Sequence, residues 1–218
     1  MKLKKELPLI GLVALPFVYL TYLWGQLPEQ VPMHYNIKGE VDRYGDKSEL
    51  ILIPILLPLL IYLIFLIVPA IDPKKQLQKM GNKYQTLKFI LTGLMSLLAL
   101  YILHSAKEQT MGNPNLIFIP IGILYLVLGN YFKTIKPNYF IGIRTPWTLE
   151  SESIWKETHR LAGKIWFVGG LLTILCSLVL DEKSNFIAFM GISLILALIP
   201  MLHSFLLFRK QRQQAKEH

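Results

Sequence analysis

The chain has 218 residues, of which 53% are hydrophobic and only 17% are charged. A soluble domain carries about a quarter charged residues, so this composition excludes an ordinary soluble domain. The net charge of +9 does not indicate nucleic-acid binding, because the basic residues lie in segments that connect long apolar stretches. The single cysteine, Cys176, excludes a disulfide framework and a CxxC metal pair within the chain.

Six windows of the sequence contain no Asp, Glu, Lys or Arg. A helix needs roughly 20 apolar residues to cross the hydrocarbon layer of a bilayer. All but one of the windows reach that length, and the exception reaches it with the preceding turn, whose Lys164 can snorkel. The windows are Leu7–Pro28, Leu50–Ile71, Phe89–Ala106, Gln109–Phe132, Ile165–Leu180 and Ser184–Phe208. The sequence therefore predicts an all-α fold, a polytopic bundle of six transmembrane helices.

The first two apolar windows each carry a further feature. The first follows Lys2, Lys4 and Lys5, as in a signal peptide, but it is too long and lacks a small-x-small cleavage site. We therefore expect an uncleaved anchor helix. In the second window Pro54 and Pro58 lie one helical turn apart, and each removes a backbone donor, which favours a bent span.

The outer loop, residues 26–49, has mixed charges and several glycines, which predict a folded cap rather than a loose tether. His34, Asp42 and Asp46 in this loop are residue types that could bind a cation. Turn-forming and hydrogen-bonding roles are the commoner use of such residues. We therefore predict no metal site and no cofactor.

The inner segment, residues 133–164, contains the most distinctive local pattern. Pro146 fixes the backbone just before a predicted helix start and restrains the residue before it, so the run 142–149 predicts a rigid elbow. Apolar residues then recur at helical spacing from Thr148 to Gly163, capped by Thr148 or Ser151. This pattern predicts a short cytoplasmic interfacial helix that could continue into the fifth span.

Arg144 is the residue of the elbow that we expect to contact a partner. Its guanidinium could stack on Trp147, bind a phosphate headgroup, or bridge to Glu150 or Glu152. We predict that this inner motif, rather than the outer loop, carries any signal.

The connecting segments alternate between the two sides of the predicted bundle. One side, with both termini, holds 18 of the Lys and Arg residues, and the other side holds 5. Basic residues stay on the cytoplasmic side, so the sequence predicts that both termini are cytoplasmic.

The sequence offers no recognisable catalytic set. It contains no HExxH, Walker or GxSxG pattern, so we predict that the protein is not an enzyme. No Asp or Glu is expected deep within a span, which argues against an ion-coupled pump.

Two stretches together resemble one known family along nearly the whole chain. The run NYFIGIRTPWTLESESIWKETHRLAGKIW resembles the signature of the SdpI/YfhL family of bacterial membrane proteins. The run LPEQVPMHYNIKGEVDRYGDKS resembles a domain of unknown function commonly fused to it. The matching positions, our candidate ligand- or partner-binding residues, are Pro32, His34, Gly39, Asp42, Gly45 and Lys47 outside, and Gly142, Arg144, Thr145, Pro146, Thr148, Trp155, His159 and Gly163 inside.

The resemblance implies a multi-pass protein of the bacterial cell membrane that protects against a secreted antimicrobial peptide. It also implies a signalling role, in which a cytoplasmic DNA-binding repressor is held at the membrane. The expected partners are therefore the lipid bilayer, a toxin peptide outside and a repressor inside, with no direct nucleic-acid binding. A small-molecule or lipid transporter is the alternative. We expect two units, residues 1–71 with the outer loop and residues 72–218 with the inner segment.

Overall fold

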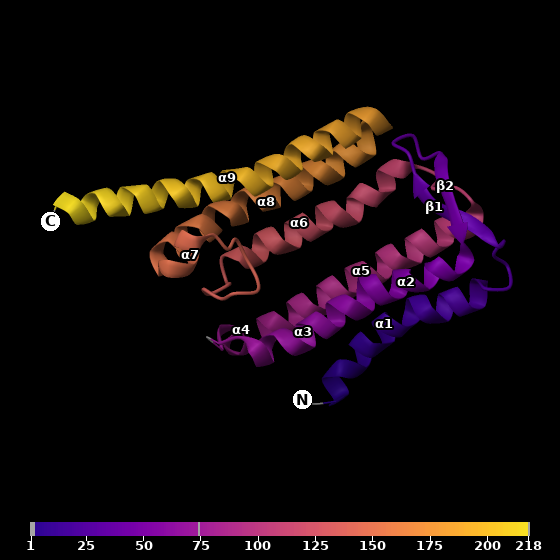
Figure 1. Ribbon diagram of the computed structural model, residues 1–218, viewed down its shortest axis with the longest axis horizontal. Helices are drawn as coiled ribbons and strands as arrows, with labels where there is room; N and C mark the ends of the chain where they lie inside the picture. The colour runs from indigo at the N-terminus through magenta and orange to yellow at the C-terminus, as the bar shows by residue number, and fades with distance from the viewer. Residues whose placement is uncertain (1–2, 74, 218) are drawn as a thin grey trace.

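The computed structural model describes residues 3–73 and 75–217, which form a bundle of long helices with a small hairpin at one end (Figure 1). Six helical segments are long and apolar enough to cross a membrane, which confirms the predicted spans and fold class. They are Glu6–Leu23, Lys47–Ile71, Asn82–Glu108, Pro114–Phe132, Glu152–Val179 and Glu182–Ala215. Many of their apolar side chains are exposed, as expected of a surface that faces lipid.

The two ends of the bundle differ in what they carry. Both chain termini lie away from the hairpin, which covers the opposite end (Figure 1). We call these the terminus end and the hairpin end. The last helix, α9 (Glu182–Glu217), extends past its neighbours at the terminus end.

The hairpin is the structure adopted by the predicted outer cap. Strands β1 (Gln30–Tyr35) and β2 (Val41–Asp46) pair antiparallel, with Gln30 opposite Asp46 and Tyr35 opposite Val41. The hairpin packs on the helices through Val31, which lies in one apolar cluster with residues of the first, second and third spans. The sequence predicted a folded loop here but gave no sign of its strands.

Four segments form the second span. They are η1 (Lys47–Ile51), α2 (Leu52–Pro54), the π-helical η2 (Ile55–Leu59) and α3 (Leu60–Ile71). Pro58 has no N–H to donate. The helix widens around it into a π-helical turn, in which the Leu60 N–H donates to the Ile55 carbonyl. The prolines therefore produce a local π-helical turn in the middle of the span.

The first three spans pack together. After the short α4 (Gln76–Lys79), helix α5 (Asn82–Glu108) lies against α1 (Leu3–Leu23) and the second span. The Ser96 hydroxyl donates to the Leu12 carbonyl over 2.7 Å. The division into units at residue 71 remains a prediction.

The last three spans form the other half of the bundle. After η3 (Pro114–Ile117), helix α6 (Phe118–Phe132) packs along α8 (Glu152–Val179), which also packs on α9. A Cβ at Gly163 would lie 2.9 Å from the Gly129 carbonyl, so the two backbones approach closely at this point.

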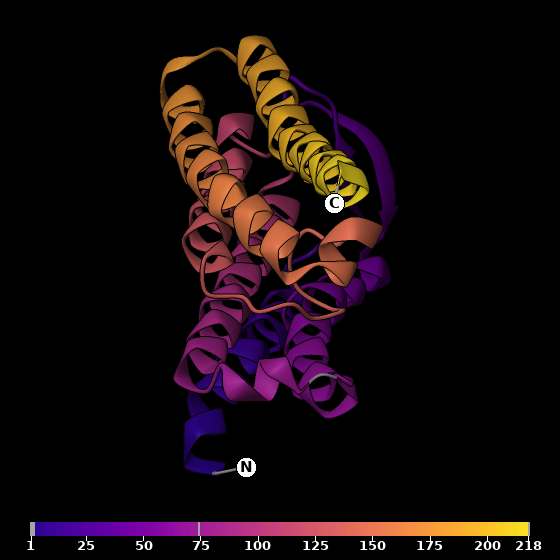
Figure 2. The same cartoon turned by 90° about the vertical axis from the view of Figure 1, so that its left-hand side faces the viewer.

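The predicted interfacial helix from Thr148 to Gly163 is wrong in its boundaries. A short α7 (Pro146–Glu150) ends at Ser151, and the Ser151 hydroxyl accepts from the Ile154 N–H as the cap of α8. The remaining residues are the first turns of α8, which continues unbroken into the fifth span, as the sequence allowed. Figure 2 shows α7 and the loop before it against the terminus end of α8.

Candidate functional sites at the two ends of the bundle

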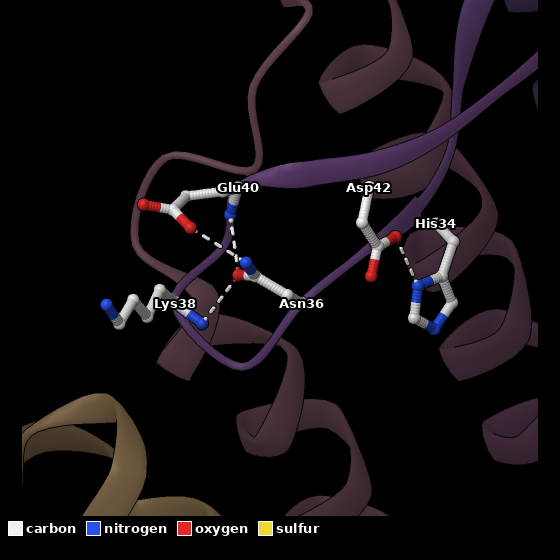
Figure 3. Close-up of polar contacts among 5 residues, drawn as sticks. All are labelled: His34, Asn36, Lys38, Glu40 and Asp42. Carbon is white, nitrogen blue, oxygen red and sulfur yellow. Dashed lines mark hydrogen bonds and ion pairs between the residues drawn. The ribbon is translucent and has the colours of Figure 1, made fainter.

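A histidine–aspartate pair lies on the hairpin. His34 Nδ1 donates to Asp42 Oδ1 over 2.6 Å, and both side chains are exposed (Figure 3). Asp46 does not join them, because its carboxylate accepts from the Ser48 N–H and caps η1. Hydrogen bonding from the Ser48 side chain, and then from its N–H, holds the pKa of Asp46 below its ordinary value. Among the described residues no three His, Cys, Asp or Glu side chains are grouped to hold a metal ion.

The turn between the strands is built on Asn36. Its side-chain oxygen accepts from the N–H groups of Lys38 and Glu40, and its Nδ2 donates to Glu40 Oε2 over 2.8 Å (Figure 3). Gly39 has a φ of +77°, which a side chain would disfavour, and a Cβ there would lie 3.3 Å from Pro114. The turn is therefore fixed internally and rests on η3.

The other predicted outer residues anchor the hairpin. Pro32 is buried, and a Cβ at Gly45 would lie 2.8 Å from the Met33 side chain. Lys47 pairs with Glu29 over 2.8 Å. These three candidates therefore have structural contacts, whereas His34 and Asp42 face solvent.

A groove of about 410 Å³ runs between the hairpin and the neighbouring ends of α6 and α9. We call it the hairpin groove. It is lined by His34, Tyr35, Asn36, Ile37, Met111, Pro114, Ile117, Phe118, Glu182 and Phe186. The Tyr35 hydroxyl donates to the Ser105 carbonyl, and burial raises its pKa, so it stays a neutral donor. The groove therefore combines an apolar wall with a few polar groups, which is the usual character of a ligand-binding pocket.

At the terminus end the loop before α7 is organised by Asn138, a residue that the sequence analysis missed. Asn138 is fully buried; its Oδ1 accepts from the Phe140 and Ile141 N–H groups, and its Nδ2 donates to the Lys136 and Ile141 carbonyls. The adjacent Pro137 and Asn138 are turn-forming residue types, a signal that could have been noted.

Gly142, Trp155 and His159 form one packed unit. The Trp155 and His159 rings stack with centroids 4.0 Å apart, and a Cβ at Gly142, whose φ is +113°, would collide with His159. His159 Nδ1 donates to the Trp155 carbonyl over 2.8 Å, and its Nε2 accepts from the Ile143 N–H over 3.0 Å. His159 is thus a neutral side chain that holds the loop to α8. Trp155 is buried and donates to the Ile135 carbonyl, rather than facing lipid as an interfacial anchor.

Thr145, Pro146 and Thr148 start α7. Thr145 and Thr148 satisfy each other's backbone in a capping box, with Pro146 at the first helical position. The Trp147 indole donates to the Ser204 hydroxyl of α9 over 2.6 Å. These hydrogen bonds fix the start of α7 and join the elbow to the last span, while the rigidity of the elbow stays a prediction.

Arg144 is an exposed residue of the elbow. Its Nη1 donates to the Tyr139 carbonyl over 2.6 Å, which closes the loop that precedes α7. Trp147 stacks on Phe208 instead of on Arg144. The predicted bridge to Glu150 or Glu152 is absent among the described residues.

A buried ion pair at the terminus end was missed by the sequence analysis. Lys88 Nζ lies 2.7 Å from Glu6 Oε1, and the Tyr62 hydroxyl donates to Glu6 Oε2. The side chains of Glu6 and Lys88 are 3% and 1% exposed. Glu6 is the first residue of the first span, so it does not contradict the expectation of no acidic side chain deep within a span. The pair borders a cavity of about 470 Å³ between the second span, α4 and α5.

Comparison with known proteins identifies the family of the chain. The SdpI/YfhL protein family matches residues 134–204, and a domain of unknown function, DUF1648, matches residues 11–57. The chain is 30% identical over 202 residues to the immunity protein SdpI of Bacillus subtilis strain 168, covering 90% of this chain and 92% of that protein. The chain belongs to the SdpI/YfhL family.

Two further comparisons complete the picture. An uncharacterized protein of Archaeoglobus fulgidus is 39% identical over 59 residues, which is 27% of this chain and 28% of that protein. No solved structure matches the chain. The family membership confirms the predicted resemblance, and the six spans confirm a multi-pass membrane protein.

Proposed function

We propose that this SdpI/YfhL-family protein is a non-enzymatic immunity protein that protects a bacterial cell against a secreted antimicrobial peptide. The main support for this proposal is the similarity to an immunity protein along 90% of the chain. The hairpin groove offers the peptide a binding place, since its apolar wall lies beside exposed His34 and Glu182. The groove needs to bind only part of a membrane-active peptide, because the bilayer already concentrates the peptide near this end of the bundle.

The test is survival of a sensitive bacterium that expresses the protein and is challenged with a panel of secreted killing peptides. Ile37 lines the groove and is 48% exposed, so Ile37→Glu should weaken protection without unfolding the hairpin. Tyr44→Glu is the matched control, because Tyr44 is 54% exposed on the same hairpin and does not line the groove. Equal protection by both variants would remove the groove from the function. Sensitivity of cells with wild-type protein to every peptide would overturn the immunity role.

The second proposed function is signalling, in which the terminus end holds a cytoplasmic DNA-binding repressor. Exposed Arg144 on the elbow supports it, because a fixed guanidinium can recognise a carboxylate of a partner. Such signalling requires the peptide to favour one of two states of the protein. Peptide-dependent recovery of the repressor in the membrane fraction, lost with Arg144→Ala, is the expected result.

Both proposals place the hairpin outside the cell and the termini in the cytoplasm. The 18 basic residues on the terminus side support this orientation. In a Cys176→Ser background, Lys38→Cys should react with an impermeant thiol reagent in intact cells. Ser153→Cys should react only after lysis, and labelling of both from outside would reverse the topology.

A further inference from the structure

Two cavities adjoin at the terminus end, between α6 and α8. The first, which we call the elbow pocket, has a volume of about 240 Å³ and is lined by three lysines, Lys133, Lys136 and Lys156. The second, the α6–α8 groove, has a volume of about 380 Å³ and is lined by Lys133 and Lys164 at its polar end. Lys133 belongs to both linings, so the two cavities meet at this residue.

The charge of this region is strongly positive. The four lysines are exposed, and no ion pair is found for any of them among the described residues. Glu152 is the acidic residue in the lining of the elbow pocket. The nearby Glu157 is already paired with Arg160. Several ammonium groups therefore lie close together and repel one another. A bound anion would offset this repulsion.

The α6–α8 groove has an apolar wall made of exposed side chains. Phe167 is 45% exposed and Val168 is 53% exposed, and both line the groove beyond Lys164. The stem of Lys133 passes over α8, since a Cβ at Gly163 would lie 3.5 Å from Lys133 Cγ. The groove is thus basic beside Lys133 and Lys164 and apolar beside Phe167 and Val168.

We propose that the elbow pocket and the α6–α8 groove form a site for one anionic phospholipid. The phosphodiester lies among Lys133, Lys136 and Lys156, and the first part of an acyl chain lies along Phe167 and Val168. Basic pockets between transmembrane helices at the membrane surface bind acidic headgroups in this way. The site goes beyond the proposed immunity function and does not depend on it, because it uses the opposite end of the bundle.

The test uses the purified full-length protein, delipidated in an uncharged detergent, and measures bound lipid by native mass spectrometry together with thermal stability. The probes are phosphatidylglycerol, phosphatidylcholine with the same chains, and inorganic phosphate. The variant is Lys133→Gln/Lys136→Gln/Lys156→Gln. The matched control is Lys75→Gln/Lys79→Gln/Lys83→Gln, which removes the same charge near the same end but outside both cavities.

We expect the wild type and the control to bind one phosphatidylglycerol, and the variant to bind it roughly tenfold more weakly. Phosphatidylcholine should bind weakly to all three proteins. Equal weakening in variant and control would show general charge attraction and overturn the site. Stabilisation by inorganic phosphate equal to that by phosphatidylglycerol would show an anion site without the acyl groove and overturn the lipid assignment.

Discussion

The bundle carries a buried set of polar contacts at the terminus end, made by Glu6, Lys88 and His159, and an exposed contact at the hairpin end, between His34 and Asp42. At the terminus end Glu6, Lys88 and His159 make their contacts with almost no solvent exposure. At the hairpin end His34 and Asp42 make an equally short contact while both face water. A short polar contact is structural where it is buried, because water cannot replace a lost partner there. Where the contact is exposed, water can replace either partner, so the side chains are available to a ligand.

The largest expected effect comes from breaking the buried ion pair at the terminus end. Lys88→Met leaves the Glu6 carboxylate buried without its partner, which should lower the free energy of unfolding by roughly 3–5 kcal/mol. The measurement is denaturant unfolding in detergent. Lys107→Met is the control, because Lys107 pairs with Glu108 at the other end of α5 with both side chains partly exposed. This change should cost about 0–1 kcal/mol.

The double variant Glu6→Gln/Lys88→Met should recover most of the lost stability, since it leaves no unpaired charge in the buried site. If the Lys88 and Lys107 variants lose similar amounts of unfolding free energy, burial does not distinguish the ion pairs at the two ends.

A smaller loss is expected from His159→Leu. The substitution leaves the buried Ile143 N–H without its acceptor, at a cost of about 1–3 kcal/mol in the free energy of unfolding. The matched change at the hairpin end is His34→Leu, which removes an exposed contact and should cost less than about 1 kcal/mol. If the two histidine variants unfold alike in the same denaturant series, burial does not separate their roles.

Arg144 sharpens the comparison, because it is an exposed residue at the terminus end, next to the buried Thr145. Arg144→Ala should cost only about 1 kcal/mol of stability through the lost bond to the Tyr139 carbonyl, yet reduce protection or repressor recruitment. Arg144→Lys should rescue poorly, because an ammonium lacks the planar fork. Arg160→Ala is the control, since Arg160 is exposed on α8 and pairs with Glu157.

The measurement is survival under peptide challenge at matched membrane abundance. Full survival with the Lys variant would show that one donor suffices, and full survival with the Ala variant would take Arg144 out of the functional site.

The smallest effect is expected from chelation at the hairpin. His34 and Asp42 lack a third metal ligand among the described residues, so a chelator should leave the thermal unfolding of folded protein unchanged. A shift that disappears in Asp42→Asn would instead establish a metal site on this exposed pair.

The sequence indicated a helix start at the elbow, but the contacts of the individual residues needed the structure. Pro146 and the following helix start were predictable from backbone restriction alone. That Thr145 caps α7, and that Thr148 reciprocates, depended on where the helix began. His159 could not be placed, because its partner Ile143 lies sixteen residues away and is brought close only when the loop folds back on α8.

The sequence by itself determined the number of spans, because the transfer of about 20 apolar residues into lipid outweighs the details of packing. It also carried the family resemblance, which two separate motifs supported. The tertiary structure alone decided that Glu6 and Lys88, each one residue outside a charge-free window, are buried against each other. A window counts charges along the chain, whereas the cost of a buried charge depends on a partner eighty-two residues away. The hairpin groove, the elbow pocket and the α6–α8 groove were hidden for the same reason, since each is assembled from separate segments.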